Sequence, residues 1–371
     1  MAFSAFGALF GTWQVLIDDL INALRLSPGQ IGLAITLGLM GSIPAMFVAN
    51  RVMQYIGLRA VLLASGMVLA LILAGLGMIS SYRILAILLF ILFSTAGVYD
   101  MTINAAAIAF EVQYSDRIVV YLHALFSGAA AFSALIVGWL LNKSVAYTAL
   151  FAYAASIIGG LVLISALLLR EPIPSRRLGK RLKGQHRKRW TSAMLLIVIV
   201  AALANLAQGA VENWSAVYLR TTLTFTALLG AGGVAIFHAA MLLGRLSTGL
   251  AIKHLEVSKV LVAAGGVTSV GITLMLLNLS SFLTLGGMLL MGVALATIQP
   301  IAFTLAGANA PNQASEASAL VTTTSYAGLI AGPILIGSIA ELTNLKVALS
   351  SIAVMGFLIM LVGQRIKSRS K

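Results

Sequence analysis

The chain consists of long apolar stretches separated by short polar connections. Each stretch has about the 20 residues that an α-helix needs to cross the hydrocarbon core of a bilayer. Because lipid offers no partner for backbone polar groups, and the alternating pattern of a β-barrel is absent, the stretches predict an all-α membrane protein. Twelve spans are expected, at residues 2–19, 29–49, 59–79, 83–110, 119–141, 145–169, 191–217, 225–251, 257–278, 282–307, 314–341 and 344–364.

Composition supports a protein embedded in a lipid bilayer. Hydrophobic residues make up 60% of the chain and charged residues 9%, with a mean hydropathy of +1.03, well beyond the range of soluble domains. The net charge of +14 does not indicate a nucleic-acid partner, because most of the 24 Lys and Arg fall on one side of the predicted membrane. The positive-inside rule then predicts a multi-pass protein of the inner (cytoplasmic) membrane with both termini in the cytoplasm.

The polar stretch at 170–190, rich in Lys and Arg, divides the chain near its middle. We therefore expect a six-helix bundle at 1–169, a basic cytoplasmic linker at 170–190, a second bundle at 191–364 and a basic tail at 365–371. A weak internal repeat agrees with two related halves. Equivalent residues recur about 200 positions apart, namely Trp13 and Trp214, Arg51 and Arg245, and Gly138 and Gly337.

Several kinds of chemistry find no support in the sequence. The absence of cysteine excludes disulfides and thiolate metal sites. Neither a P-loop nor a hydrolase or zinc-protease motif is present, so we expect no enzyme activity, cofactor or metal. The opening apolar run lacks a basic flank and a small-residue cleavage site, which predicts a first membrane helix rather than a signal peptide. Nothing in the pattern implies an oligomer.

The fourth span carries a polar stripe. Asn104 and Glu111 lie about 40° and 20° from Asp100 around a helix, so the three side chains share one face. Asp100 is expected near mid-membrane with no Lys or Arg at its depth, which disfavours its charged form and makes it the candidate proton carrier. The alternative is a permanently protonated, structural Asp100. Asn104 would either bind substrate or hold Asp100.

Further polar residues predict a site shared by several helices. Glu212 is a second proton-coupling candidate. His123 and His238 would serve as proton relays or as neutral structural side chains. A cytoplasmic gate is expected from Arg51, Glu111, Arg117 and Arg245. Trp13, Trp214 and Tyr326 would stack on a sugar ring or belong to interfacial belts. The candidate substrate-binding residues are Gln14, Asp18, Asn104, Asn205, Gln208, Trp214, Gln299 and Tyr326.

Twelve spans in two halves with a basic central loop resemble the major facilitator superfamily. The segments YDMTINAAAIAFE, LHALFSG, VENWSAVYLR, MLLGR and SYAGLIAGPILIG are similar to its fucose-permease-like branch, especially the YbjJ-type bacterial inner-membrane permeases. The resemblance implies two pseudo-symmetric six-helix bundles, with helices 1, 4, 7 and 10 around a cavity that opens alternately to each side. Two loops depart from the family pattern: Asn50 replaces an acid before Arg51, and no Asp follows Arg245.

These features together predict a secondary transporter for a small polar solute, such as a sugar or a related metabolite, with proton symport through Asp100. Its partners would be the solute, protons and the lipid bilayer. An efflux antiporter for amphipathic compounds is the alternative within transport, although the fifth helix lacks the proline of the drug-antiporter signature. A transporter-like sensor without net flux is a further alternative, and a membrane-embedded enzyme a distant one.

Overall fold

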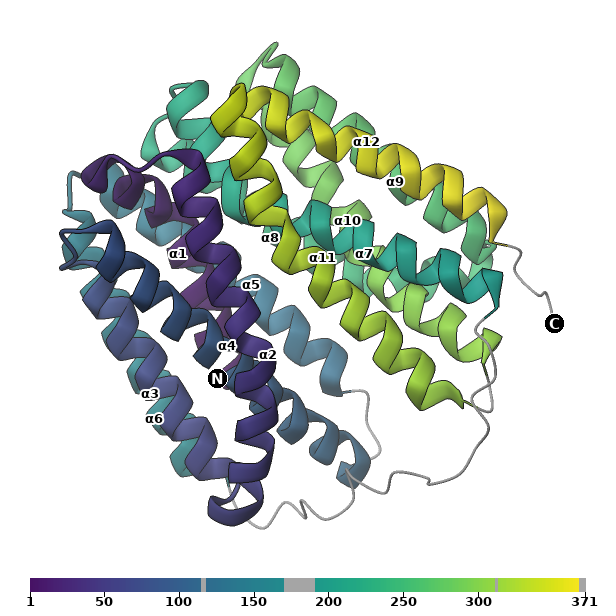
Figure 1. Ribbon diagram of the computed structural model, residues 1–371, viewed down its shortest axis with the longest axis horizontal. Helices are drawn as coiled ribbons and strands as arrows, with labels where there is room; N and C mark the ends of the chain where they lie inside the picture. Colours follow the sequence, from purple (N-terminus) through teal and green to yellow (C-terminus); the bar gives the residue numbers. More distant parts are fainter. Residues whose placement is uncertain (115–117, 170–190, 311–312, 367–371) are drawn as a thin grey trace.

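The computed structural model describes residues 1–114, 118–169, 191–310 and 313–366, and in these ranges the chain forms twelve long α-helices (Figure 1). The first half contains α1 Ala2–Leu24, α2 Pro28–Ile56, α3 Leu58–Leu76, α4 Tyr82–Tyr114, α5 Ile118–Asn142 and α6 Tyr147–Leu168. The second half contains α7 Ser192–Val217, a π-helical turn at Tyr218–Thr222, α8 Ala227–His254, α9 Val257–Leu277, α10 Ser281–Asn309, α11 Ala314–Leu342 and α12 Leu345–Arg365. The predicted all-α membrane fold is confirmed.

Short polar signals set the helix ends. Ser27 caps α2 by accepting the backbone N–H of Gln30, whose side chain returns a hydrogen bond to the Ser27 N–H, and Pro28 occupies the first helical position. Gly57 alone joins α2 to α3, and its φ of 84° explains why a glycine is needed there. Such short connections keep sequential helices antiparallel.

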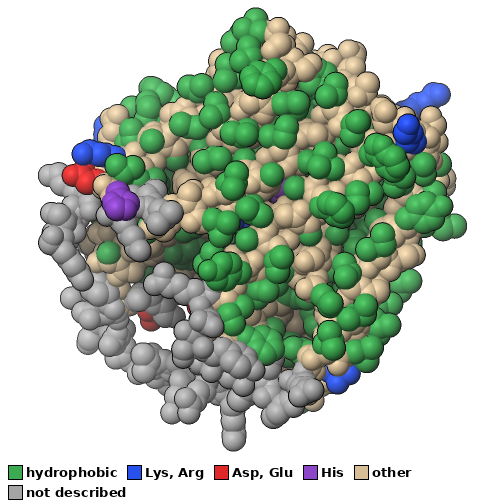
Figure 2. All heavy atoms as spheres, turned by 180° about the vertical axis from the view of Figure 1, so that it is seen from behind, with side chains coloured by type: hydrophobic (Ala, Val, Ile, Leu, Met, Phe, Trp, Pro, Cys, Tyr) green, Lys and Arg blue, Asp and Glu red, His purple; other side chains and the backbone are tan. Residues whose placement is uncertain are grey.

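Eleven of the helices in the described ranges are long and apolar enough to cross a membrane, and α1 is the exception. Its second half carries Thr12, Gln14, Asp18 and Asp19, which lower its hydropathy. Figure 2 shows hydrophobic side chains covering most of the visible face, with Lys, Arg, Asp and Glu mainly near its edges. This distribution suits a protein surrounded by lipid acyl chains.

Two bundles lie side by side (Figure 1), and the main contacts between them are those of α5 with α8 and of α2 with α11. These contacts are closest at the end with the α1–α2 and α7–α8 connections, called here the α1–α2 end. A Cβ on Gly32 would lie 2.6 Å from the carbonyl oxygen of Pro333, and a Cβ on Gly138 would overlap Ala231. Glycine therefore permits both helix crossings.

The opposite end, called here the α2–α3 end, has fewer links between the bundles. Within the described ranges, hydrogen bonds between the two halves occur from the middle of the molecule to the α1–α2 end. The bundles are therefore held together at one end and around a central cavity.

Candidate functional site

A cavity of about 260 Å³ lies between the two bundles and collects most of the predicted site residues. Side chains from α1, α2, α4, α5, α7, α8 and α11 line it. The described part of α10 contributes none, so the family-based expectation of helices 1, 4, 7 and 10 is wrong for the tenth helix. The polar residues that line the cavity are Gln14, Ser42, Asp100, His123, Asn205, Gln208, Glu212, Asn213, His238, Arg245 and Tyr326.

Asp100 joins the two halves of the protein at this cavity. Its Oδ1 accepts a hydrogen bond of 2.9 Å from Asn104 Nδ2, one turn along α4, as their shared face predicts. Its Oδ2 accepts a bond of 3.1 Å from the Tyr326 hydroxyl on α11, in the other bundle. Asn104 Oδ1 lies 3.1 Å from His123 Nε2 on α5, so a polar chain runs from Tyr326 to His123.

Arg245 lies on the cavity wall, not at a cytoplasmic helix end as predicted. Arg245 lies inside α8, which extends to His254, so the family resemblance that placed it in a cytoplasmic loop is wrong here. Its Nη1 donates to Ser127 Oγ at 2.6 Å and to the His123 carbonyl at 3.4 Å, both on α5. The expectation that no cation lies at the depth of this site is therefore wrong, since Arg245 reaches the residues that hold Asp100.

Two further pairs place α1 and α7 in the site. His238 Nε2 lies 2.9 Å from Gln14 Oε1, which links α8 to α1, and the side chains of both residues are almost completely buried. Glu212 Oε1 accepts a bond of 2.8 Å from Gln208 Nε2 on the same face of α7. The predicted polar stripe of α7 is thus present and faces the cavity.

Gln299 does not line the cavity but bonds to Asn205, which does. Its Oε1 accepts hydrogen bonds from Asn205 Nδ2 at 2.7 Å and from Ser325 Oγ at 3.1 Å. It therefore connects α7, α10 and α11 and does not line the cavity, contrary to the prediction of a substrate contact. The helix continues through the neighbouring Pro300.

Asp18 and Trp214 are also misplaced by the sequence prediction. Asp18 and Asp19 pair with Arg220 at the α1–α2 end, at 3.2 Å for Asp18 Oδ2 and 2.6 Å for Asp19 Oδ2. Trp214 is 1% exposed and packs beside Gly337 at the crossing of α2 and α11. Both residues therefore lie in contacts at the α1–α2 end and not in the cavity.

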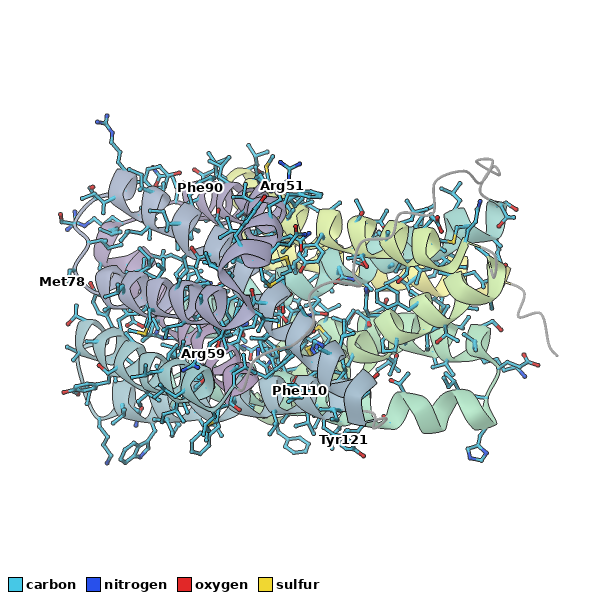
Figure 3. All side chains as sticks on the ribbon, turned by 90° about the horizontal axis from the view of Figure 1, so that it is seen from below. Arg51, Arg59, Met78, Phe90, Phe110 and Tyr121 are labelled. Atoms are coloured by element: carbon cyan, nitrogen blue, oxygen red, sulfur yellow. The ribbon has the colours of Figure 1, made fainter. Side chains whose placement is uncertain are left out.

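The residues expected at a cytoplasmic gate do not form one in the described ranges. Arg51 lies within α2, which ends at Ile56, and its side chain is exposed at the surface of the bundle (Figure 3). Glu111 instead accepts the backbone N–H of Val119 at 3.0 Å, which caps the start of α5. Arg117 lies outside the described residues.

Sequence reasoning missed the phenylalanines of the cavity and the pairing of Arg220 with α1. Six aromatic side chains of the first bundle line the cavity, namely Phe3, Phe6, Phe10, Trp13, Phe93 and Phe126. Trp13 was expected as a stacking residue, but the five phenylalanines cannot be told from core residues in sequence, because they lie within apolar runs. Arg220 could have been found: it follows Asp19 by 201 positions, the spacing of Trp13 and Trp214.

Two related helix bundles around a polar central cavity define the class of two-domain membrane transporters. The family model described as Major Facilitator Superfamily matches residues 1–333. The chain belongs to this superfamily.

Relatives support the assignment over nearly the whole chain. An uncharacterized MFS-type transporter of Yersinia pestis, YPO1221/y2967, is 30% identical over 361 residues, covering 96% of this chain and 91% of that protein. Membrane protein MosC of Rhizobium meliloti is 25% identical over 365 residues, covering 95% and 85%.

Solved structures share the same fold. The nucleoside transporter NupG has a TM-score of 0.79 at 13% identity, with 98% of this chain and 96% of that chain covered. A bacterial homologue of the human lysosomal transporter Spinster has a TM-score of 0.72 at 12% identity, with 98% and 94% covered.

Proposed function

We propose that the protein is a proton-coupled secondary transporter that binds a small polar solute in the central cavity and moves it by alternating access. The observation that carries the proposal is the hydrogen bond from Tyr326 to Asp100. The Asp100 carboxylate lies at a contact between the two bundles, so in the proposed rocking motion a change in its protonation would alter that contact. A protonated carboxyl group offers fewer acceptor sites than an ionised one, so proton binding weakens this link.

The contacts at the α1–α2 end support a state closed on that side. Arg220 bridges to Asp19 through two bonds of 2.6 and 3.1 Å, and Gly29 N–H donates to Glu341 Oε2 at 2.9 Å. With both termini cytoplasmic, as the distribution of Lys and Arg predicts, this end faces outward. The conformation is then the inward-facing one of the proposed cycle, in an inner membrane.

The ligand must be found before transport can be tested. A thermal-shift screen of the purified chain against sugars, organic acids and amphipathic drugs would supply it. Uptake of the hit into proteoliposomes is then measured with and without an imposed pH gradient.

We expect gradient-driven accumulation by the wild type, and its loss in Asp100→Asn with exchange of solute retained. Tyr326→Phe removes the link between halves but keeps the carboxylate, so it should slow uptake without abolishing the response to the gradient. Lys259→Gln is the matched control, because Lys259 contacts only Glu256 on the surface of α9 in the described structure. Full gradient-driven uptake by Asp100→Asn would disprove the proton-carrier role, and binding without flux would favour a sensor.

A further inference from the structure

The central cavity combines an aromatic surface with hydrogen-bonding side chains. The first bundle supplies aromatic rings in mutual contact, with centroids of Phe6 and Phe10 at 5.0 Å, Phe6 and Phe126 at 5.7 Å, and Trp13 and Phe93 at 5.9 Å. Polar groups come from both bundles: Gln14, Ser42, Asp100 and His123 from the first, and Asn205, Gln208, Glu212, Asn213, His238, Arg245 and Tyr326 from the second. A bound molecule therefore meets both apolar rings and hydrogen-bonding groups. At about 260 Å³, the cavity lies below the ~300–1,000 Å³ of typical ligand pockets, which favours a compact ligand.

Arg245 is the fixed charge of this cavity. Its guanidinium donates through Nη1 to a hydroxyl and a backbone carbonyl, and no carboxylate of the described residues lies within ion-pair distance of it. Nε and Nη2 have no hydrogen-bond partner in the described ranges. A guanidinium stays protonated, whereas Asp100 and Glu212 can be neutralised by a proton. Arg245 is thus the cavity charge with which an anionic ligand would pair.

Two buried polar atoms in the wall also lack partners in the described structure. Trp13 Nε1, a donor only, and His238 Nδ1 belong to side chains that are each 1% exposed and line the cavity. His238 Nε2 faces an amide oxygen of Gln14, so Nε2 carries the proton and Nδ1 is a bare acceptor. Because buried polar atoms are normally hydrogen-bonded, these two indicate a ligand with both an acceptor and a hydroxyl donor.

We propose that the cavity binds a small cyclic hydroxy-monocarboxylate, with its carboxylate on Arg245 and its ring against the aromatic surface. This inference rests on the proposed function and names its substrate class. The planar guanidinium matches a carboxylate through two parallel hydrogen bonds. The ring covers apolar surface that is otherwise exposed to water, and a ring hydroxyl donates to His238 Nδ1.

Binding to the purified full-length chain tests the proposal without requiring transport. The probes are 3-hydroxybenzoate, its uncharged isostere 3-hydroxybenzamide, shikimate as a non-aromatic ring acid, and acetate as a carboxylate without a ring. Isothermal titration gives each dissociation constant for the wild type, Arg245→Gln, Arg245→Lys and the surface control Lys259→Gln.

We expect at least one ring acid to bind saturably, and the amide and acetate to bind about 30-fold more weakly or not at all. Arg245→Gln should weaken the ring acid by about 30-fold or more, and Arg245→Lys by about tenfold, since lysine keeps the charge but not the planar fork. The control should match the wild type.

The proposal is overturned if neither ring acid binds, if 3-hydroxybenzamide binds as tightly as 3-hydroxybenzoate, or if Arg245→Gln leaves the affinity unchanged. Should Arg245→Gln fail to fold, the isostere comparison on the wild type and the lysine variant decide the matter. Arg245-dependent binding without flux under any gradient would uphold the ligand class and reject transport. Proton-driven uptake of another solute, with no binding of either ring acid, would uphold transport and reject the ligand class.

Discussion

The cluster of Arg220, Asp18 and Asp19 is expected to control opening of the α1–α2 end. Arg220 comes from the π-helical turn after α7, and both carboxylates come from α1, so the cluster must break when the bundles separate there. The side chains are 16%, 3% and 17% exposed, respectively. Replacing Arg220 by Gln removes the cation and leaves two adjacent carboxylates in a poorly hydrated place.

The size of the effect follows from this burial. Removing one partner of a fully buried pair costs about 3–5 kcal/mol, whereas an exposed pair contributes about 0–1 kcal/mol. For partly exposed Arg220 and Asp19, an intermediate loss of about 2–3 kcal/mol is reasonable. Because each 1.4 kcal/mol is a factor of ten, the population open at the α1–α2 end should rise about 30- to 150-fold.

The chain has no cysteine, so an introduced one is a unique label. Leu39 lines the cavity, and Leu39→Cys in right-side-out vesicles can be modified by a membrane-impermeant maleimide only when the α1–α2 end opens. The labelling rate should increase strongly in Leu39→Cys with Arg220→Gln. Adding Asp19→Asn to this variant should not increase it much further, because the shared link is already lost.

Arg83 supplies the matched control, since it is an exposed arginine at the same end with no hydrogen bond or ion pair to the other bundle in the described ranges. Arg83→Gln should leave the labelling rate unchanged. Equal rates in Arg220→Gln and the parent Leu39→Cys protein would refute the idea that the cluster holds this end closed. So would an equal rise in Arg83→Gln, which would point to surface charge alone.

Two other substitutions follow from the packing. Gly138→Val should force α5 and α8 apart at their crossing, because the new side chain would overlap Ala231. The labelling rate of Leu39→Cys should then rise. Gly160→Val on α6 is the control, because its side chain would enter open space and should leave the labelling rate unchanged. Gln299→Ala should lower the free energy of unfolding by about 1–3 kcal/mol, because it leaves Ser325 Oγ without its acceptor and Asn205 Nδ2 with the Ala201 carbonyl alone. A melting temperature equal to wild type would contradict that role.

Helical periodicity predicted the parts of the site that lie on one element. Asp100 and Asn104 are one turn apart and bond to each other, and Gln208 and Glu212 do the same on α7. Such pairs follow from the 3.6-residue repeat and the rarity of polar side chains in membrane helices. The residues opposite them, such as Tyr326 and His238, depend on how helices pack, which one sequence does not determine.

One error arose where a family pattern assigned a residue to a loop. Arg245 falls within the predicted span 225–251, yet the resemblance placed it in the loop after the eighth helix. In the structure the Ser247 and Thr248 hydroxyls donate hydrogen bonds to the Gly244 carbonyl, and α8 continues. Inside an apolar environment, serine and threonine hydroxyls can donate their hydrogen bonds to a backbone carbonyl of the preceding turn in this way. Arg245 was therefore placed at the membrane surface, and the cavity was predicted without its cation.

The position of each contact between the bundles explains how closure and proton binding could be linked. Gly32 faces Gly337, and Gly138 faces Ala231, so the crossings at the α1–α2 end depend on close backbone approach and are lost on slight separation. Contacts in the middle run through long side chains, such as Tyr326 to Asp100, and can persist through a larger movement. In the proposed cycle this region is the pivot. A proton on Asp100 would act where small rotations are tolerated, so it would change the balance between the two states without having to pull the closed end apart itself.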